Sequence, residues 1–172
     1  NIMLKSLSDI DHYSPEEIGS SFDENAYIKA KYASERTDFK VNCIADDSGL
    51  CIDILDGEPG IYSSRWAKKG DYRSAFKKIK DKIENLGFSM NGQEAKFICV
   101  LAFVDTNRNR RFYRGVLKGN LIYPPRGEKG FGYDPIFLPK NYKKTLAEMD
   151  RETKNLISHR KSALENFISD HL

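Results

Sequence analysis

An apolar segment that is interrupted by two adjacent carboxylates most constrains how this chain folds. Residues 41–45 are mostly apolar strand formers, Asp46-Asp47-Ser48-Gly49 follows, and apolar residues resume at Leu50. This order predicts a buried strand that ends in an acidic turn at the edge of a hydrophobic core. Because a buried carboxylate is costly unless it is paired, hydrogen-bonded or bound to a cation, one interpretation is a site that binds Mg²⁺ or activates water. The other is a simple turn made of turn-forming residues.

The composition indicates one soluble domain. The chain has 172 residues, of which 40% are hydrophobic and 31% charged, which is enough to build a core. Its net charge of +3 is too balanced to indicate a nucleic-acid partner, and no apolar run is long enough to span a membrane. Three cysteines lie in apolar runs, which is typical of reduced core thiols in a cytoplasmic protein: Cys43, Cys51 and Cys99.

Hydrophobic periodicity and capping residues predict alternating strands and helices. We expect strands over residues 1–7, 41–45, 50–55, 95–105 and 110–123, and helices over residues 21–36, 72–86 and 152–169. Ser21 and Glu24 form a capping-box pattern at the first helix, and Gly115 and Gly119 are candidate β-bulges. Because the strands pair as hairpins, the predicted fold class is α/β with a mixed sheet.

Residues 124–139 are expected to form a long irregular loop that carries a cluster of special chemistry. Phe131 and Tyr133 flank Gly132, and Asp134 follows at once. An aromatic face can stack on a nucleobase, a carboxylate can accept hydrogen bonds from ring N–H groups, and glycine lets a ligand approach the backbone. The alternative is a rigid loop whose aromatic side chains only fill the core.

The predicted last helix carries an arginine in an unusual place. Arg160 falls in the middle of an apolar stripe, in register with Leu156 and Leu164, and His159 lies at its border. An arginine on a core-facing stripe must extend to solvent or meet a partner. Its planar donor fork would suit a base carbonyl or a phosphate, and a structural ion pair is the competing interpretation.

Four motifs occur along the chain in a recognisable order. They are Ser21-Phe22-Asp23-Glu24-Asn25-Ala26, then Ala45 to Leu50 running on to Pro59-Gly60-Ile61-Tyr62-Ser63, then Gly130 to Pro135, and finally Lys154 with Ser158-His159-Arg160. Together they resemble the Ham1/RdgB/inosine triphosphate pyrophosphatase family over residues 22–167. The resemblance implies a Mg²⁺-dependent enzyme that hydrolyses ITP, dITP and XTP to the monophosphate and pyrophosphate. It also implies a cytoplasmic homodimer and an elongated two-lobed fold with the active site in the cleft between the lobes.

The resemblance also assigns roles to acidic and hydroxyl side chains. Asp47 would be the metal-linked carboxylate and the base for water, and Glu24 the second metal-side carboxylate. Ser48 would contact the substrate beside them. Asp46 would support Asp47 or cap the turn.

The remaining roles concern the nucleotide. The base would be held by Phe131, Gly132, Tyr133 and Asp134, with Phe131 stacking. Lys154 would meet the nucleotide, while His159 and Arg160 would read the six-position oxygen that distinguishes hypoxanthine from adenine.

Residues 1–20 depart from the family pattern. The family opens with a strand, a Gly/Asn-containing phosphate-binding loop that ends in lysine, and a helix, so we expect this segment to be missing from a single domain of residues 1–172. One alternative function is a catalytically weak nucleotide-binding protein of the same fold. Another is a Maf-like pyrophosphatase, against which Ser158-His159-Arg160 argues. Nucleic-acid binding is not expected, because no basic stripe alternates with exposed aromatic residues.

Overall fold

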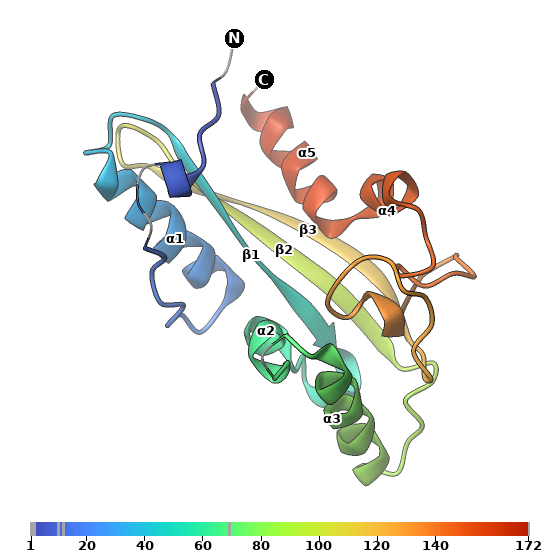
Figure 1. Ribbon diagram of the computed structural model, residues 1–172. Helices are drawn as coiled ribbons and strands as arrows, with labels where there is room; N and C mark the ends of the chain where they lie inside the picture. Colours follow the sequence, from blue (N-terminus) through green and yellow to red (C-terminus); the bar gives the residue numbers. More distant parts are fainter. Residues whose placement is uncertain (1–2, 10, 12, 69, 172) are drawn as a thin grey trace. The chain divides into compact units, whose positions relative to one another are not determined.

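Strand β1 (Cys43–Ile52) runs without a break through the acidic segment (Figure 1). In this computed structural model, which describes residues 3–9, 11, 13–68 and 70–171, Asp46 to Gly49 are all extended. The predicted turn between two strands is therefore wrong. Alternation along the strand places Asp47 and Gly49 on a buried face together with Cys43 and Cys51, so sheet packing overrides the turn preference of these residues.

Four strands form one sheet in the order β1-β2-β3-β4. Strands β2 (Glu94–Val104) and β3 (Arg110–Leu121) confirm the predicted hairpin. The short strand β4 (Phe137–Pro139) lies in the stretch expected to be irregular, and it pairs antiparallel with β3, with Leu121 opposite Phe137. The prediction of a first strand is wrong for residues 3–7. The described residues before Leu7 form no strand, and a 3₁₀ turn begins at Leu7. Residues 1 and 2 lie outside the described residues.

Two of the three predicted helices are confirmed. They are α1 (Phe22–Arg36) and α3 (Tyr72–Asn85), and the short helix α2 (Ser63–Trp66) was not predicted. Only half of the capping box forms at α1. The Ser21 hydroxyl accepts a hydrogen bond from the Glu24 N–H, but the Glu24 carboxylate binds Ser20 instead of returning to Ser21.

The predicted C-terminal helix is two helices, α4 (Arg151–Ile157) and α5 (His159–His171). Ser158 between them is extended, and its hydroxyl accepts a hydrogen bond from the Lys161 N–H at 3.1 Å, as an N-cap does. The prediction of one continuous apolar stripe along a helix of residues 152–169 is therefore wrong. Leu156 and Leu164 are 65% and 45% exposed, and Arg160 is an exposed residue of the first turn of α5.

The chain divides into two compact units. Unit 1 comprises residues 1–47 and 100–113, and unit 2 comprises residues 48–99 and 114–172. The core of unit 2 includes Leu50, Ile79 and Phe137. Among the described residues, no helix combines the length and apolar character needed to cross a bilayer.

Unit 1 is held together by small side chains and by arginine–aromatic pairs. Helix α1 buries Ala26 and Ala30 completely. The hairpin arginine Arg108 lies 4.5 Å from the ring centroid of Phe39, and Arg110 lies 4.9 Å from that of Tyr27. These hairpin cations therefore have structural partners. The active-site cleft implied by the family resemblance stays a prediction.

Candidate active site

A carboxylate cluster in unit 1 is centred on Asp47, of which only 6% is exposed. Lys29 Nζ lies 3.2 Å from Asp47 Oδ1, and Asn25 Nδ2 lies 3.3 Å from Oδ2. The same ammonium group lies 2.8 Å from Glu17 Oε1. Asn25 and Lys29 are four residues apart on α1, so they share one face of the helix and both reach the strand that carries Asp47.

Burial and charge act in opposite directions in this cluster. Burial raises the pKa of the Asp47 carboxyl above its ordinary value, although the nearby Lys29 charge and its hydrogen bond lower it. Burial opposes the charge on Lys29, but Glu17 and Asp47 outweigh that effect and raise the Lys29 pKa. Asp47 is therefore a stronger proton acceptor than an exposed aspartate, and it stands beside a permanently charged cation.

Glu24 occupies the exposed first turn of α1. Its carboxylate accepts hydrogen bonds from the Ser20 N–H at 2.7 Å and the Ser20 hydroxyl at 2.9 Å. These bonds hold the pKa of Glu24 below its ordinary value, so the group stays ionised. Its neighbour Asn25 contacts Asp47, which brings the two carboxylates to the same end of α1.

Oxygen donors of this kind fit a magnesium ion that the substrate helps to bind. In the described part of the chain, no three His, Cys, Asp or Glu side chains gather as a ready-made metal site. Mg²⁺ commonly uses one or two carboxylates together with waters and substrate phosphates. Asp47 and Glu24 supply that number of carboxylates and no soft ligand.

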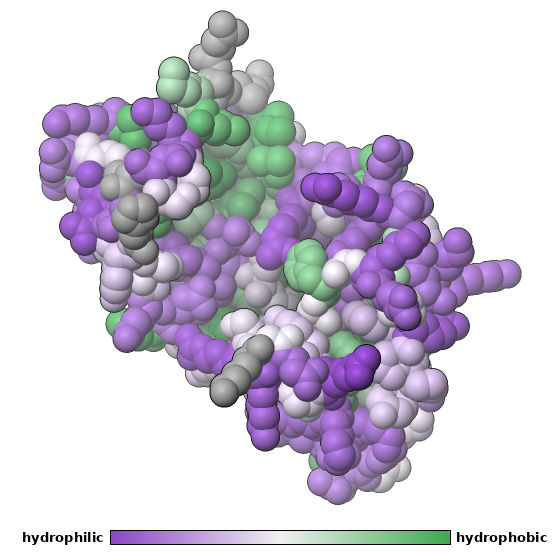
Figure 2. Space-filling view, in the orientation of Figure 1, coloured by the Kyte–Doolittle hydropathy of each residue, from purple (hydrophilic) through white to green (hydrophobic). Residues whose placement is uncertain are grey.

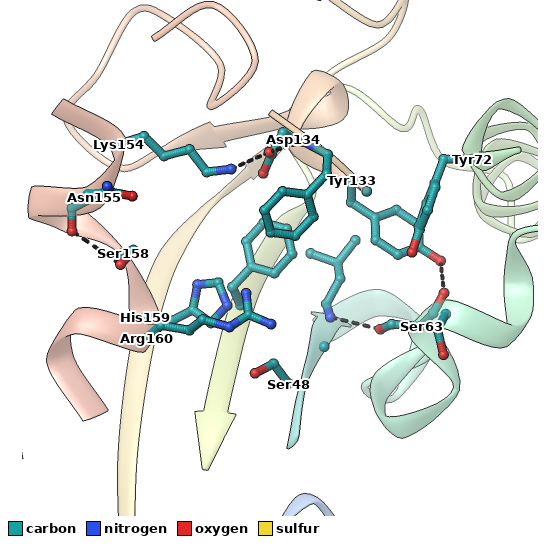
Figure 3. Close-up of a pocket in the computed structure, with 16 residues that line it drawn as sticks. Ser48, Ser63, Tyr72, Tyr133, Asp134, Lys154, Asn155, Ser158, His159 and Arg160 are labelled. Atoms are coloured by element: carbon teal, nitrogen blue, oxygen red, sulfur yellow. Dashed lines mark hydrogen bonds and ion pairs between the residues drawn. The ribbon is translucent and has the colours of Figure 1, made fainter. Parts of the chain in front are cut away.

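Unit 2 contains a separate pocket of about 320 Å³ (Figure 3). Its lining comes from the second half of β1, from β2, from α2 and the start of α3, from the loop before β4, and from helices α4 and α5. The pocket gathers every residue that the sequence proposed for the base and the nucleotide, together with Ser48: Phe131, Gly132, Tyr133, Asp134, Lys154, His159 and Arg160. Sequence reasoning missed Tyr72, Phe97 and Asn155, which line it as well.

Hydrogen bonding to the Asp134 carboxylate stabilises the loop that carries Phe131. This buried carboxylate accepts a hydrogen bond from the Phe131 N–H at 2.8 Å and forms a short ion pair with Lys154, drawn in Figure 3. Gly130 and Gly132 have φ values of +79° and +64°, which favour glycine strongly. Phe131 is left 67% exposed, with Lys154 Nζ 4.3 Å from the centroid of its ring. A planar group entering the pocket therefore meets an available aromatic face beside a cation.

Tyr133 is a wall of the pocket and also a structural anchor. Its ring is 3% exposed and packs edge-on against Tyr72, with ring centroids 5.1 Å apart. Its hydroxyl donates to the Ser63 carbonyl at 2.7 Å (Figure 3), and the Ser63 hydroxyl accepts from the Leu50 N–H at 2.9 Å. This chain of bonds connects the aromatic loop to the strand segment that carries Ser48.

In helix α5, His159 is buried against the sheet side chain Phe97, whereas Arg160 extends into the pocket. His159 is buried and stacks on Phe97, with ring centroids 5.0 Å apart and planes 12° apart. Arg160 points into the pocket in Figure 3, and its guanidinium carbon lies 5.8 Å from the Phe131 centroid. Gly115 of β3 allows this helix to approach, because a Cβ there would collide with the backbone of His159 and Ala163. We therefore find a close packing contact at this predicted bulge.

Residues 1–170 match the model of the Ham1 family. The chain belongs to the Ham1 family.

Other Ham1-family proteins resemble the chain over most of its length. It is 45% identical over 151 residues to a dITP/XTP pyrophosphatase of Oceanobacillus iheyensis, covering 87% of this chain and 75% of the relative. It is 40% identical over 166 residues to that of Brucella melitensis, covering 89% and 74%. A solved HAM1 protein from Coxiella burnetii has a TM-score of 0.86 at 38% identity, covering 95% of this chain and 82% of the other. The Staphylococcus aureus Ham1 protein has a TM-score of 0.79 at 35% identity, covering 94% and 83%.

Proposed function

We propose that this chain is a nucleoside triphosphate pyrophosphatase that acts on non-canonical purine nucleotides, namely ITP, dITP and XTP. The observation that carries the proposal is the buried Asp47 with its raised pKa, followed directly on β1 by Ser48 of the aromatic pocket. Such a reaction needs a carboxylate that accepts a proton and a pocket that binds the nucleobase. Relatives at 40–45% identity are named dITP/XTP pyrophosphatases, which supports this substrate class.

In the proposed reaction, Asp47 accepts a proton from a water molecule as that water attacks the α-phosphorus. The new bond joins the water oxygen to the α-phosphorus, and the bond from the α-phosphorus to the bridging oxygen breaks. Pyrophosphate takes that bridging oxygen and leaves the nucleoside monophosphate behind. Negative charge grows on the phosphate oxygens in the transition state, and the cation of Lys29 is placed to offset part of it.

Asp47 and Glu24 would hold the magnesium ion, with triphosphate oxygens completing its coordination. When bound, the ion would neutralise phosphate charge and orient the triphosphate. Asn25 and Ser20 keep the two carboxylates in place through the hydrogen bonds described above.

Base selectivity would come from the pocket of unit 2. Phe131 would stack on the purine, while His159 and Arg160 would recognise the six-position oxygen. Adenine has an amino group at that position, which leaves the Arg160 donor without an acceptor. Arg160 is exposed in the unbound protein, and a bound purine would cover its guanidinium. A donor that is covered and left unmatched costs about 1–3 kcal/mol, which would discriminate against adenosine triphosphate.

We also propose that the enzyme is a cytoplasmic homodimer, as the family resemblance implies. The three cysteines are buried free thiols, which supports a reducing compartment. Sedimentation analysis of the purified protein tests the oligomeric state.

The function is tested by measuring pyrophosphate release from ITP, dITP, XTP and ATP, with Mg²⁺ and with a chelator. The proposal predicts Mg²⁺-dependent release that favours the three non-canonical substrates. Binding of ITP without release would identify a nucleotide-binding protein of the same fold. Release from pyrimidine nucleotides in preference to ITP would favour a Maf-like activity.

A further inference from the structure

A second hollow in unit 2 lies beside helix α3 and is separate from the pocket described above. It has a volume of about 370 Å³, and it is lined by Trp66 and the polar face of α3. A water molecule occupies about 30 Å³ of the liquid, so the hollow has room for a much larger ion. Figure 2 shows that the molecular face around α3 is mainly hydrophilic.

The charge around this hollow is unbalanced. Four lysines line it, against the single carboxylate of Asp81: Lys68, Lys77, Lys78 and Lys82. Lys77 pairs with Asp81, and Lys82 pairs with Glu58 at 2.7 Å. Within the part of the chain that the structure describes, Lys68 and Lys78 form no ion pair. Both existing pairs are largely exposed, so they add little stability and can exchange partners.

Lys78 and Lys82 are like charges four residues apart on α3, and Asp81, which lies three residues after Lys78, pairs with Lys77 instead. Elsewhere on α3, Lys77 and Lys80 each have a carboxylate four residues later, which is a favourable spacing. Lys78 instead has Lys82 at that position. Two like charges at this spacing destabilise a helix by a few tenths of a kcal/mol.

Both of these ammonium groups converge on the same indole. Lys78 Nζ lies 3.9 Å and Lys82 Nζ 5.6 Å from the Trp66 ring centroid. A cation–π contact at an exposed site is weak, whereas an ammonium–phosphate hydrogen bond is charge-assisted and stronger. An anion that enters the hollow would therefore bind both lysines and relieve their repulsion.

We infer that the Trp66 hollow, defined by Trp66, Lys68, Lys77, Lys78 and Lys82, is a binding site for a diphosphate group. Either free pyrophosphate or the tail of a nucleoside di- or triphosphate would supply that group. Two linked phosphoryl groups carry enough charge and length to contact several of the lysines together. Among the described residues that line the hollow there is no second aromatic side chain for a run of stacked bases, so a single-stranded nucleic acid fits less well.

Trp66 makes the site directly observable, because it is the chain's single tryptophan. We would titrate the intrinsic fluorescence of the intact protein with pyrophosphate, orthophosphate, inosine diphosphate and uncharged inosine, without Mg²⁺. The inference predicts a saturable change with pyrophosphate at lower concentration than with orthophosphate, weakening with added salt, and no change with inosine. A response to inosine diphosphate and not to free pyrophosphate would assign the site to the nucleotide tail.

Matched variants separate this site from the active site. Lys78→Gln/Lys82→Gln is expected to weaken binding about tenfold or more, while Lys78→Arg/Lys82→Arg retains it. Lys80→Gln on the same helix, which pairs with Glu84, removes one positive charge outside the lining of the hollow and is expected to bind normally. Asp47→Asn should leave the titration unchanged, so a failure of the proposed catalysis would not affect this result.

Three results would overturn the inference. They are an unchanged fluorescence at saturating pyrophosphate, a response that survives Lys78→Gln/Lys82→Gln, and a response that disappears in Asp47→Asn. The last result would show that the response depends on the carboxylate cluster of unit 1 and not on the hollow alone.

Discussion

The ammonium group of Lys29 contacts Asp47 at 3.2 Å and Glu17 at 2.8 Å, so one cation on α1 serves two carboxylates of unit 1. Asp47 lies deeper than Glu17, and its side chain is only 8% exposed. Its pKa stays raised despite the cation, because burial has the larger effect. The cluster thus holds a carboxylate that is ready to accept a proton.

Asp47→Asn should change how the stability of the protein depends on pH. The Asp47 pKa is higher in the folded protein than in the unfolded chain. Between these two pKa values the folded state therefore binds more protons than the unfolded state. The original protein loses stability as pH rises through that range, because the buried carboxylate becomes ionised. The free energy of unfolding of Asp47→Asn, relative to the original protein, should therefore be greater at neutral pH than in acid below both pKa values. Denaturant unfolding across this pH range checks the sign, and a relative stability that decreases with rising pH would contradict it.

Lys29→Met should lower the stability of the protein at neutral pH. Removing the cation leaves Asp47 and Glu17 facing each other without compensation, so we expect a loss of about 1–3 kcal/mol at neutral pH. The Asp47 pKa should rise further, moving the acid limb of the pH–rate profile to higher pH. Lys31→Met is the control, because its pair with Glu35 is half exposed, and an equal loss there would count against the Lys29 assignment.

Arg160→Gln tests base recognition. The variant should lose about 1–3 kcal/mol of discrimination, so the ratio of kcat/KM for ITP over ATP should fall by a factor of about 5 to about 150. Lys161→Gln, also in the first turn of α5, removes a charge that pairs with Glu165 and should leave the ratio unchanged. A ratio that stays the same in Arg160→Gln would remove this residue from the base site.

Gly115→Ala tests the packing that positions α5. An added Cβ would collide with the backbone at His159 and Ala163, so the helix must shift. We expect a lower melting temperature together with a lower ratio of ITP to ATP turnover, because His159 and Arg160 move with the helix. Gly87→Ala provides a contrast: its φ of +85° strains the backbone, but a Cβ meets no neighbour, so stability should fall without a change in the ratio.

Local signals predicted the elements that depend on local chemistry. The Ser21 capping pattern of α1 and the apolar periodicity of α3 identified these two helices to within a residue or two. The continuity of β1 could not be read locally, because Asp46 to Gly49 are turn-forming residues that long-range sheet packing holds extended. The break at Ser158 was hidden because apolar residues on both sides of it happened to match one helical period.

The pocket in unit 2 was predicted better than the cluster in unit 1. Phe131 to Asp134, Lys154, His159 and Arg160 meet in one pocket, as the sequence motifs indicated. Lys29 was missed although its spacing from Asn25 places both on one helical face, since nothing in the sequence shows which face meets Asp47. The exposure of Arg160 could not be foreseen either, because it depends on the separate start of α5.

The most direct test of the central claim is the rate of Mg²⁺-dependent pyrophosphate release from ITP by the original protein, Asp47→Asn and Asp53→Asn. Asp53 is an exposed carboxylate shortly after β1 that pairs with Lys96, so its variant controls for loss of one negative charge. The account predicts release by the original protein and by Asp53→Asn, and a loss of about 10²-fold or more in Asp47→Asn, which stays folded. Full activity in Asp47→Asn would contradict the assignment of Asp47 as the base.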